Sequence, residues 1–294
     1  MSSRCLTNRD IKAQAASLGF DACGVAQAAP VDAVAAAHYQ RRIALGHFAG
    51  MDYMTRHVDI RLDPRLLHPG VRTIVSVAVN YMPARRQPAL CLYAQGEDYH
   101  EVLKSRLRLL MERIEGHGRC FVDTAPVMER YWAWRAGLGT WCRNGLLSVP
   151  GFGPTVFLGE LFLEEEVDGY DRPLTPAVPL DGWQTLCPAL TPDGLDARLC
   201  ANYWTIEHRG PLPDGMRLHR SFYGCDRCMR ACPEFREAHA TGDASFQPSD
   251  LLLAMTAEDW RELTPEQFRA LFRHSAVKRA KYEGLVRNIS RWEP

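Results

Sequence analysis

The sequence lacks long hydrophobic runs, an excess of either charge, internal repeats and low-complexity tracts. No apolar stretch approaches the roughly 18–20 residues of a membrane-spanning helix, so we expect no membrane partner. Lysine plus arginine and aspartate plus glutamate each total 35, and this balance argues against a generally basic nucleic-acid-binding protein. The first five residues, Met1-Ser-Ser-Arg-Cys5, do not resemble a secretory signal, which predicts a cytoplasmic location.

Cysteine, by contrast, is abundant, and five of the ten cysteines lie between Cys187 and Cys232. In the cytoplasm, clustered cysteines indicate metal or redox chemistry rather than disulfides. The segment Cys225-Asp-Arg-Cys228-Met-Arg-Ala-Cys232-Pro is the trailing part of the C-x-x-C-x-x-C-x-x-x-C-P run with which bacterial ferredoxins hold [4Fe–4S] clusters. It therefore predicts an iron–sulfur site.

That run is incomplete. The positions at which a full run would carry cysteine and this chain does not are Phe222, Ala177, Leu180 and Trp183. The cysteines that remain for one four-ligand site are Cys187, Cys200, Cys225 and Cys228. Tetrahedral zinc would accept the same thiolates, but the proline after Cys187 and after Cys232 favours a [4Fe–4S] cluster. We expect Cys232 to be left without a partner.

Hydrophobic periodicity predicts an α+β fold. The expected helices span 8–18, 34–45, 98–116, 124–136, 249–256, 265–272 and 275–290, and the expected strands span 20–25, 71–81, 120–123 and 155–162. A stretch rich in proline and leucine at 171–192 reads as a boundary. The expected parts are an α/β-like domain over 1–170, a ferredoxin-like iron–sulfur domain over 171–240 and a helical segment over 241–294.

Two aspartates stand at predicted helix starts. Asp98 and Glu101 have the spacing of a capping box. Asp123 ends a predicted strand and precedes a predicted helix, where the commoner role is an N-cap and the alternative is a catalytic acid. His100 is a lone histidine, and such residues more often belong to the surface or core than to a ligand set.

Two further signals keep both a structural and a functional interpretation. The glycine-rich stretch from Gly137 to Asn144 is not a phosphate-binding loop, and it suits either a close approach to a large ligand or a helix C-cap. The end of the chain has an excess of basic residues, which indicates a solvated helix face more often than a phosphate contact. These residues are Arg269, Arg273, Lys278, Arg279, Lys281, Arg287 and Arg291.

Taken together, the motifs resemble the epoxyqueuosine reductase family of cobalamin- and iron–sulfur-dependent reductases. The motifs that carry the resemblance are Met51–His57, Arg61–Leu67, Tyr93–His100, Val122–Arg130, Arg135–Gly139, Phe157–Glu160, Leu195–Cys200, Thr205–Glu207 and Tyr223–Cys228. They occur in the expected order over about residues 10–290. The resemblance implies a base-off cobalamin between the first domain and the cluster domain, with a nearby [4Fe–4S] cluster that delivers electrons.

The resemblance also implies roles for individual residues. The proton-donating aspartate of the family falls on Asp123, which overturns the N-cap preference, and a second important acidic position falls on Asp98. The cluster ligands fall on the four cysteines already grouped by spacing. Contacts to the cobalamin are expected at Tyr93, His100, Gly139, Asn144 and Gly159.

The chain departs from the family pattern in three ways. The three cysteines of the outer cluster are replaced by Ala177, Leu180 and Trp183, so we expect a divergent member with one cluster. The family's Gly-x-Gly-Lys-Asn turn reads Thr140-Trp-Cys-Arg-Asn144. Longer members carry a C-terminal helical-repeat extension that helps to hold tRNA, and this chain stops at Pro294.

The leading hypothesis is an oxidoreductase that removes an epoxide oxygen by two-electron reduction, leaving an alkene, in queuosine modification of tRNA. It would work as a monomer with an external electron donor such as flavodoxin or ferredoxin. The missing extension and the zero net charge suggest the alternative of a small-molecule substrate. The missing outer cluster suggests a non-catalytic cobalamin-binding or electron-transfer protein, and a zinc-stapled binding module is a further alternative.

Overall fold

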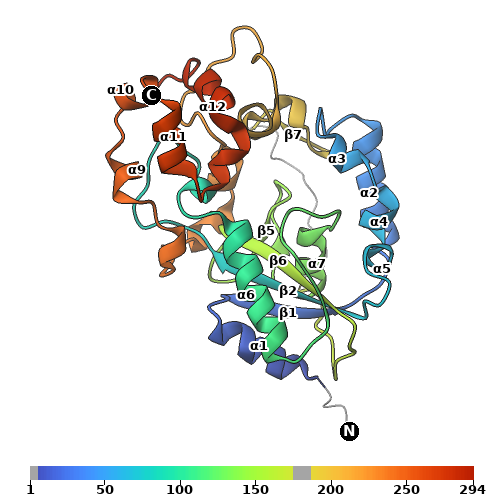
Figure 1. Ribbon diagram of the computed structural model, residues 1–294. Coiled ribbons are helices and arrows are strands. Elements are labelled where there is room, and N and C mark those ends of the chain that lie inside the picture. The colour runs from blue at the N-terminus through green and yellow to red at the C-terminus, as the bar shows by residue number, and fades with distance from the viewer. Residues whose placement is uncertain (1–5, 175–186) are drawn as a thin grey trace.

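A four-stranded antiparallel sheet organises the first half of the chain (Figure 1). The computed structural model describes residues 6–174 and 187–294. The strand order is β1-β2-β6-β3, and these strands span Ala22–Gln27, Thr73–Asn80, Val156–Leu163 and Gly118–Phe121 respectively. Every residue of β2 is buried, because this largely apolar strand is covered on both faces.

Helices pack on both faces of the sheet. On one face, α1 (Asn8–Ser17) and α6 (Tyr99–Arg113) share a hydrophobic cluster with alternate residues of β2 and β6. On the other face, α7 (Glu129–Arg135) packs with Ile74 and Ala78 of β2. The two-residue period of the strands therefore divides the core into two layers.

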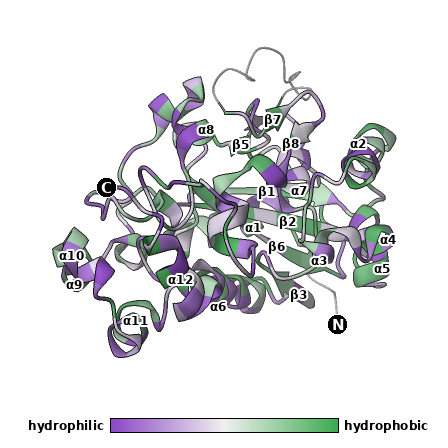
Figure 2. Cartoon of the chain, turned by 90° about the horizontal axis from the view of Figure 1, so that it is seen from above, coloured by the Kyte–Doolittle hydropathy of each residue, from purple (hydrophilic) through white to green (hydrophobic). Residues whose placement is uncertain are grey.

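Four helices connect β1 to β2 and lie together on one side of the molecule (Figure 1). They are α2 (Ala33–Ala44), α3 (Asp52–Thr55), α4 (Val58–Leu62) and α5 (Pro64–Leu67). Peripheral helices such as α2 carry both hydrophilic and hydrophobic residues (Figure 2), as amphipathic helices do. The side chain of Asp32 caps the first of these helices by accepting the N–H groups of its first turn.

The C-terminal residues form a helical lobe. Its elements are α9 (Asp250–Ala254), α10 (Ala257–Arg261), α11 (Pro265–Phe272), a 3-10 helix (Ala276–Ala280) and α12 (Lys281–Ile289). These helices share one hydrophobic cluster with Phe222 and Tyr223 and with four residues from an earlier part of the chain, Ala89, Leu90, Cys91 and Ala94. Segments that are far apart in the sequence therefore build this lobe together.

The cysteine-rich part of the chain folds into short elements. They are β7 (Leu190–Thr191), β8 (Gly194–Leu195), a 3-10 helix (Ala197–Leu199), a π-helix (Tyr203–Glu207), α8 (Arg227–Arg230) and a second 3-10 helix (Pro233–Glu237). Before them in the chain, a hairpin joins β4 (Thr140–Trp141) to β5 (Leu147–Ser148). Two further 3-10 helices span Leu92–Ala94 and Ala244–Phe246.

The α+β class is confirmed, but some predicted boundaries are wrong. The helix expected at 124–136 begins only at Glu129, because a residue before a proline avoids helical conformation and Pro126 follows Ala125. The helix expected at 249–256 ends at Ala254, and an unexpected helix, α10, follows it with Thr256 as its N-cap in a capping box.

The capping box expected at Asp98 is also not formed. Asp98 is the N-cap of α6, but its side chain accepts the N–H of His100 at 3.1 Å. Glu101 instead faces Lys278 of the C-terminal lobe, at 3.1 Å. A contact distant in the sequence has replaced a local one.

The division at 170 and 240 stays a prediction, because residues 175–186 of the proline-rich stretch lie outside the described residues. No helix in the two described ranges has the length and apolar character needed to cross a bilayer.

Truncating Leu107 tests how firmly α6 is held on the sheet. Its side chain is fully buried in α6 and packs towards Gly159 of β6. We expect Leu107→Ala to lower the free energy of unfolding by about 2–5 kcal/mol, measured by urea denaturation. The matched control is Leu109→Ala in the same helix, where the side chain is 44% exposed and a change within about 0.5 kcal/mol is expected. Equal losses for the two variants would contradict this packing.

Candidate functional site

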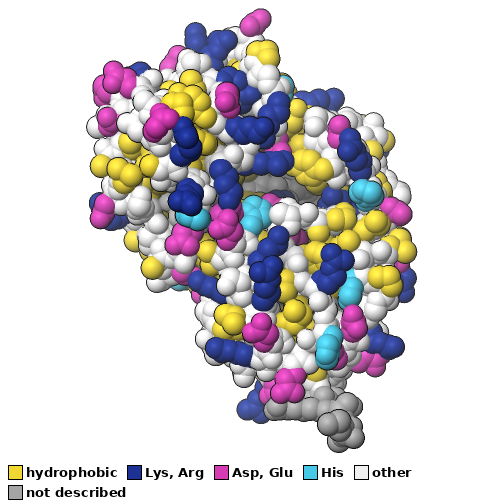
Figure 3. Space-filling view, viewed as in Figure 1, with side chains coloured by type: hydrophobic (Ala, Val, Ile, Leu, Met, Phe, Trp, Pro, Cys, Tyr) yellow, Lys and Arg dark blue, Asp and Glu magenta, His cyan; other side chains and the backbone are white. Residues whose placement is uncertain are grey.

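The face seen in Figure 1 is hollowed between the C-terminal lobe and the helices that connect β1 to β2 (Figure 3). Side chains from both sides come together here. The guanidinium of Arg279 lies 6.0 Å from the ring centre of Tyr53, and it binds Glu207 at 2.7 Å. Burial raises the pKa of Tyr53 to about 12, and the nearby charges of Glu207 and Asp123 add to this shift. Asp123 therefore belongs to the same neighbourhood.

Asp123 is an exposed carboxylate on a strained backbone. It follows β3 with φ of 49°, in the left-handed region that few non-glycine residues adopt. Its side chain is 61% exposed, accepts the hydroxyl of Tyr99 at 2.5 Å, and has Nε2 of His100 at 3.8 Å. The N-cap role weighed for Asp123 is wrong, since Met128 occupies the N-cap position of α7. Backbone strain at a reactive carboxylate is typical of functional sites.

A chain of charged groups centred on the buried Asp98 lies behind Asp123. Asp98 pairs with Nδ1 of His100 at 2.6 Å through one oxygen and with Nζ of Lys278 at 2.7 Å through the other. Burial alone would raise the pKa of Asp98, but the hydrogen bonds from His100 and Lys278 outweigh it and hold this pKa well below its ordinary value. An ionised carboxylate only accepts, so Nδ1 of His100 carries a proton and Nε2 faces Asp123.

Two more acids lie behind Asp123, and sequence reasoning missed both. Glu160 of β6 is fully buried, and neither of its carboxyl oxygens has a hydrogen-bond partner in the described part of the chain. Burial and the neighbouring Glu129 raise the pKa of Glu160 well above its ordinary value. Burial raises the pKa of Glu129 to about 8, and this side chain accepts the backbone N–H of Asp123. The available signal was an acidic residue inside the apolar strand Val156–Leu163.

The four cysteines grouped by spacing are close enough to influence one another. Burial raises the pKa of Cys228 to about 12, and the charges of Cys187, Cys200 and Cys225 contribute. No three of their sulfur atoms belong to a group of ligands within 4.8 Å of one another in the described ranges. The sulfur atoms of a tetrahedral zinc site lie closer, at about 3.8 Å for Zn–S bonds of about 2.3 Å. The wider spacing suits a multi-iron cluster better than a single zinc ion.

For some of the residues expected to contact a cofactor, packing within the protein is enough to explain why that residue type is present. A side chain at Gly139 would collide with the carbonyl oxygen of Ser148 at 2.1 Å, and one at Gly159 would lie 3.1 Å from Leu107. Both glycines are therefore explained by packing within the protein. Gly137, with φ of 73°, follows the end of α7 as a C-cap glycine would.

Packing within the protein explains Asn144 and Tyr93 less completely. The Nδ2 atom of Asn144 is buried without a hydrogen-bond partner among the described residues, while its amide group lies beside Cys228. Such an unpaired donor beside the cysteines suits a sulfur-rich ligand. The hydroxyl of Tyr93 donates to that of Tyr223 at 3.4 Å, and its ring packs edge-on against Tyr99.

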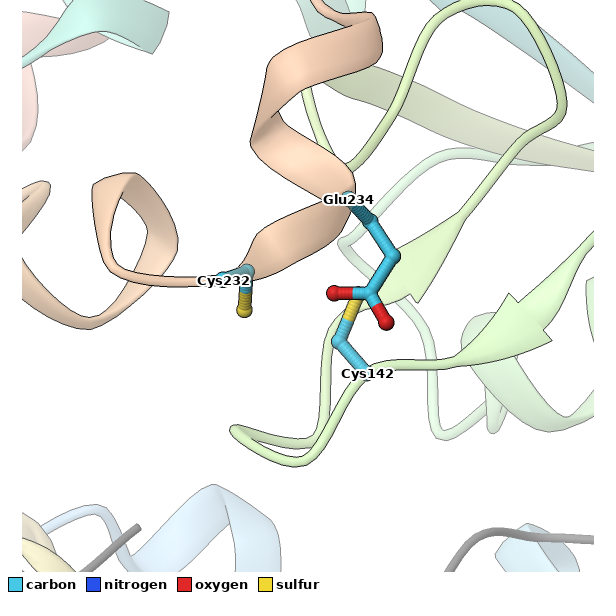
Figure 4. A group of neighbouring side chains, drawn as sticks. All are labelled: Cys142, Cys232 and Glu234. Atoms are coloured by element: carbon cyan, nitrogen blue, oxygen red, sulfur yellow. The ribbon is translucent and has the colours of Figure 1, made fainter.

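Cys232 is not alone, contrary to the prediction from spacing. Its sulfur lies within 4.8 Å of the sulfur of Cys142 and of a carboxyl oxygen of Glu234 (Figure 4). Cys142 and Glu234 were not among the predicted site residues. A cysteine in the Thr140–Asn144 turn, where the resembling pattern has glycine, was the signal that could have found the group.

Most basic residues at the end of the chain are already engaged. Lys278 binds Asp98, Arg279 binds Glu207 and Arg269 binds Glu266. Arg287 donates to backbone carbonyls, among them that of Gly210 at 2.7 Å. In the described ranges, Arg273, Lys281 and Arg291 have no ion pair. The excess of positive charge is therefore partly structural.

Comparisons with known proteins agree on one group. Residues 61–124 match the family model described as "Epoxyqueuosine reductase QueG, DUF1730". An epoxyqueuosine reductase of Leadbetterella byssophila is 37% identical, over 96% of this chain and 97% of the relative. One of Cyclobacterium marinum is 38% identical over 95% and 94%. One of Pseudomonas aeruginosa is 33% identical over 96% and 83%.

Solved structures share the fold. An epoxyqueuosine reductase in complex with an epoxyqueuosine-modified tRNA-Tyr stem loop superposes with a TM-score of 0.85 at 24% identity. The alignment covers 96% of this chain and 79% of that one. An epoxyqueuosine reductase from Streptococcus thermophilus gives 0.83 with the same identity and coverage. These matches are in line with the α+β architecture described above.

The acids behind Asp123 predict a pH-dependent stability. Glu129 stays protonated in the folded chain up to its pKa of about 8, but ionises near its ordinary value of 4.5 when unfolded. The unfolded chain then binds fewer protons between these values, so the free energy of unfolding falls as the pH rises from about 5 to 8. We expect Glu129→Gln to remove up to about 4 kcal/mol of this fall, measured by urea denaturation at several pH values. Glu262→Gln, at an exposed position of the C-terminal lobe, is the control, and an unchanged slope for Glu129→Gln would contradict the assignment.

Proposed function

The chain belongs to the epoxyqueuosine reductase family, and on this premise we propose that it reduces epoxyqueuosine in tRNA to queuosine. The reaction takes two electrons and two protons, converts the epoxide to an alkene and releases its oxygen as water. Relatives that carry this name match almost the whole chain. The alignments with the Leadbetterella and Cyclobacterium proteins cover 97% and 94% of those relatives.

The observation that carries the proposal is the position of Asp123. It offers a solvent-accessible carboxylate in the neighbourhood of Tyr53, and the acid Glu129 holds its backbone N–H from behind. Few solvated surface aspartates have both a left-handed backbone and a tyrosine hydroxyl at 2.5 Å. Such a carboxylate suits proton transfer to a reacting oxygen.

In the proposed reaction, Asp123 gives a proton to the oxygen that leaves the substrate carbon. Tyr99 donates a hydrogen bond to the carboxylate and fixes its orientation. His100 lies 3.8 Å away and can pass a replacement proton from solvent after a small movement. Asp98 and Lys278 hold the imidazole in one orientation, so they act as positioning residues.

The residues present fit the cofactors that the family implies. The charges of Cys187, Cys200 and Cys225 all act on Cys228, so the four thiols are neighbours, and the buried amide of Asn144 lies beside Cys228 as a donor to its sulfur. A cobalamin bound against the proposed domain 1–170 near Tyr53 would lie next to the proton donor, since the charge of Asp123 acts on Tyr53. When bound, cobalamin and one [4Fe–4S] cluster would supply the two electrons that break the carbon–oxygen bond.

We further propose that this member holds a single cluster and takes electrons from an external flavodoxin- or ferredoxin-type donor. The sequence has no cysteine at positions 177, 180 and 183, which lie outside the described residues. The proposed cluster domain, 171–240, then contributes Cys187, Cys200, Cys225 and Cys228 as its ligands.

The expected absence of a C-terminal extension was a main reason to consider a small-molecule substrate, and the comparison with relatives weakens it. The Leadbetterella relative, which is named an epoxyqueuosine reductase, is matched over 97% of its own length. Exposed Arg273 and Lys281 are free of ion pairs in the described ranges and can meet phosphates. A tRNA partner is therefore the better proposal.

Replacing Asp123 tests the proton donor. We expect Asp123→Asn to lower kcat on epoxyqueuosine tRNA by about 10²–10⁴-fold while binding of tRNA stays unchanged, since the amide keeps the shape and loses the acid. The turnover is followed by mass spectrometry of the digested nucleosides. The control is Asp214→Asn on an exposed loop, which should keep normal turnover. Turnover of Asp123→Asn within a few-fold of the parent would remove this residue from the mechanism.

Metal analysis tests the single cluster. Protein purified without oxygen should contain about four iron and four sulfide per chain, with bound cobalamin after reconstitution. Cys200→Ser should lose most of the iron, because one of four ligands is removed. About eight iron per chain would contradict the one-cluster proposal, and full iron content in Cys200→Ser would contradict the ligand assignment.

A further inference from the structure

Cys142, Cys232 and Glu234 meet at a place that the proposed function does not use (Figure 4). Cys142 follows β4 in the hairpin, Cys232 follows α8, and Glu234 belongs to the 3-10 helix Pro233–Glu237. One ligand atom from each lies within 4.8 Å of the other two. Both cysteines are buried, at 2% and 3% exposure. The group is therefore enclosed and made of metal-binding side chains.

The carboxylate of Glu234 lacks a hydrogen-bond donor or cation for one of its oxygen atoms in the described residues. Its Oε2 atom is buried and has no hydrogen-bond partner in the described residues, and no arginine, lysine or histidine there forms an ion pair with it. A buried carboxylate beside two thiols is costly unless a cation or donors compensate it. Native proteins rarely leave such an atom unsatisfied, so the group calls for a positive partner.

The loop that follows the β4–β5 hairpin packs closely against the 3-10 helix that carries Glu234. A side chain at Gly153 would lie 2.5 Å from the carbonyl oxygen of Glu234, which only glycine permits. The backbone N–H of Gly151 donates to a carboxyl oxygen of Glu237 at 3.0 Å. The chain that leaves the hairpin is therefore tied to the helix that supplies Glu234.

We propose that Cys142, Cys232 and Glu234 bind one zinc ion, with water as the fourth ligand. Two thiolates and one carboxylate suit zinc, which forms bonds of about 2.3 Å to sulfur and about 2.0–2.2 Å to oxygen in a tetrahedron. Ligand atoms within 4.8 Å of one another fit a single ion, in contrast to the wider spacing of the other four cysteines.

The ion would tie the β4–β5 hairpin to the cysteine-rich segment across about ninety positions of the chain. Binding needs both thiols deprotonated, so it releases protons and weakens at low pH. The site needs neither cobalamin nor the proposed [4Fe–4S] cluster, and its test does not depend on turnover.

The zinc content and the iron content of the protein should depend on different cysteines. In protein purified from zinc-supplemented medium, then desalted with a mild chelator, we expect about one zinc per chain. Cys142→Ser should lose at least about 90% of the zinc and keep its iron, whereas Cys200→Ser should lose iron and keep its zinc. Cys120→Ser, a half-buried cysteine of β3, is the matched control and should keep both metals. Zinc that is unchanged in Cys142→Ser, or absent from the parent, overturns the proposal.

The ligands can be read directly by X-ray absorption at the zinc edge. Two sulfur atoms at about 2.3 Å and two oxygen atoms at about 2.0 Å support the site. Four sulfur ligands would show zinc in the four-cysteine site, and oxygen or nitrogen ligands alone would show an adventitious ion. Loss of two titratable thiols without zinc would show a disulfide, and each of these three results overturns the proposal.

Glu234→Gln covers the case in which Cys142→Ser fails to fold. It keeps both thiols and nearly the same volume, and it should weaken zinc affinity at least about tenfold in chelator competition, because the anionic ligand is lost. Its matched control is Glu237→Gln in the same 3-10 helix, which should bind zinc as the parent does. Equal affinities for Glu234→Gln and the parent would remove Glu234 from the site.

Discussion

The ion pair between the buried carboxylate of Asp98 and the exposed ammonium group of Lys278 is the contact on which both the assembly of the fold and the proposed chemistry depend. Asp98 caps α6 on the sheet, and Lys278 comes from the 3-10 helix of the C-terminal lobe, so their contact of 2.7 Å joins the two. The backbone N–H of Asp98 also donates to the carbonyl of His274, at 2.7 Å. Loss of Lys278 would remove one of the two side-chain partners of the buried Asp98 carboxylate and leave His100 as the other. It would also loosen the imidazole of His100 that Asp98 orients.

The acidic residues that lie close together behind Asp123 lower the stability of the folded chain. Glu160 lies in the centre of the sheet without a partner among the described residues, and Ser76 beside it on β2 is unpaired as well. An apolar side chain would suit that position better, since unpaired buried polar groups cost several kcal/mol. The left-handed backbone of Asp123 adds a cost of about 1–3 kcal/mol. Both costs fall on the residues that surround the proposed proton donor, where strain has a function to serve.

Local sequence patterns predicted the elements well and the long-range contacts poorly. The two-residue and 3.6-residue periods located the buried strand β2 and the helix α6 to within a few residues. Asp98 was recognised as a cap, but its pairing with Lys278 joins positions 180 apart, and the tail residue was taken for a solvated one. The contact of Cys142 with Cys232 has the same character, because no periodic pattern links a hairpin turn to a distant cysteine run. The burial of Glu160, which sets its protonation, likewise exists only in the folded sheet.

The central claim is that this chain reduces an epoxide carried on tRNA, with Asp123 at the hollowed face as the proton donor. The most direct measurement uses protein with full iron and cobalamin content, together with a chemical reductant. One reaction contains epoxyqueuosine tRNA, and a parallel reaction contains the free epoxyqueuosine nucleoside. Mass spectrometry of the nucleosides then reports the loss of one oxygen atom. The account predicts rapid loss of that oxygen on tRNA and much slower loss on the free nucleoside, because contacts to the tRNA position the epoxide. An unchanged epoxide on tRNA in fully loaded protein, or faster reduction of the free nucleoside, would contradict it.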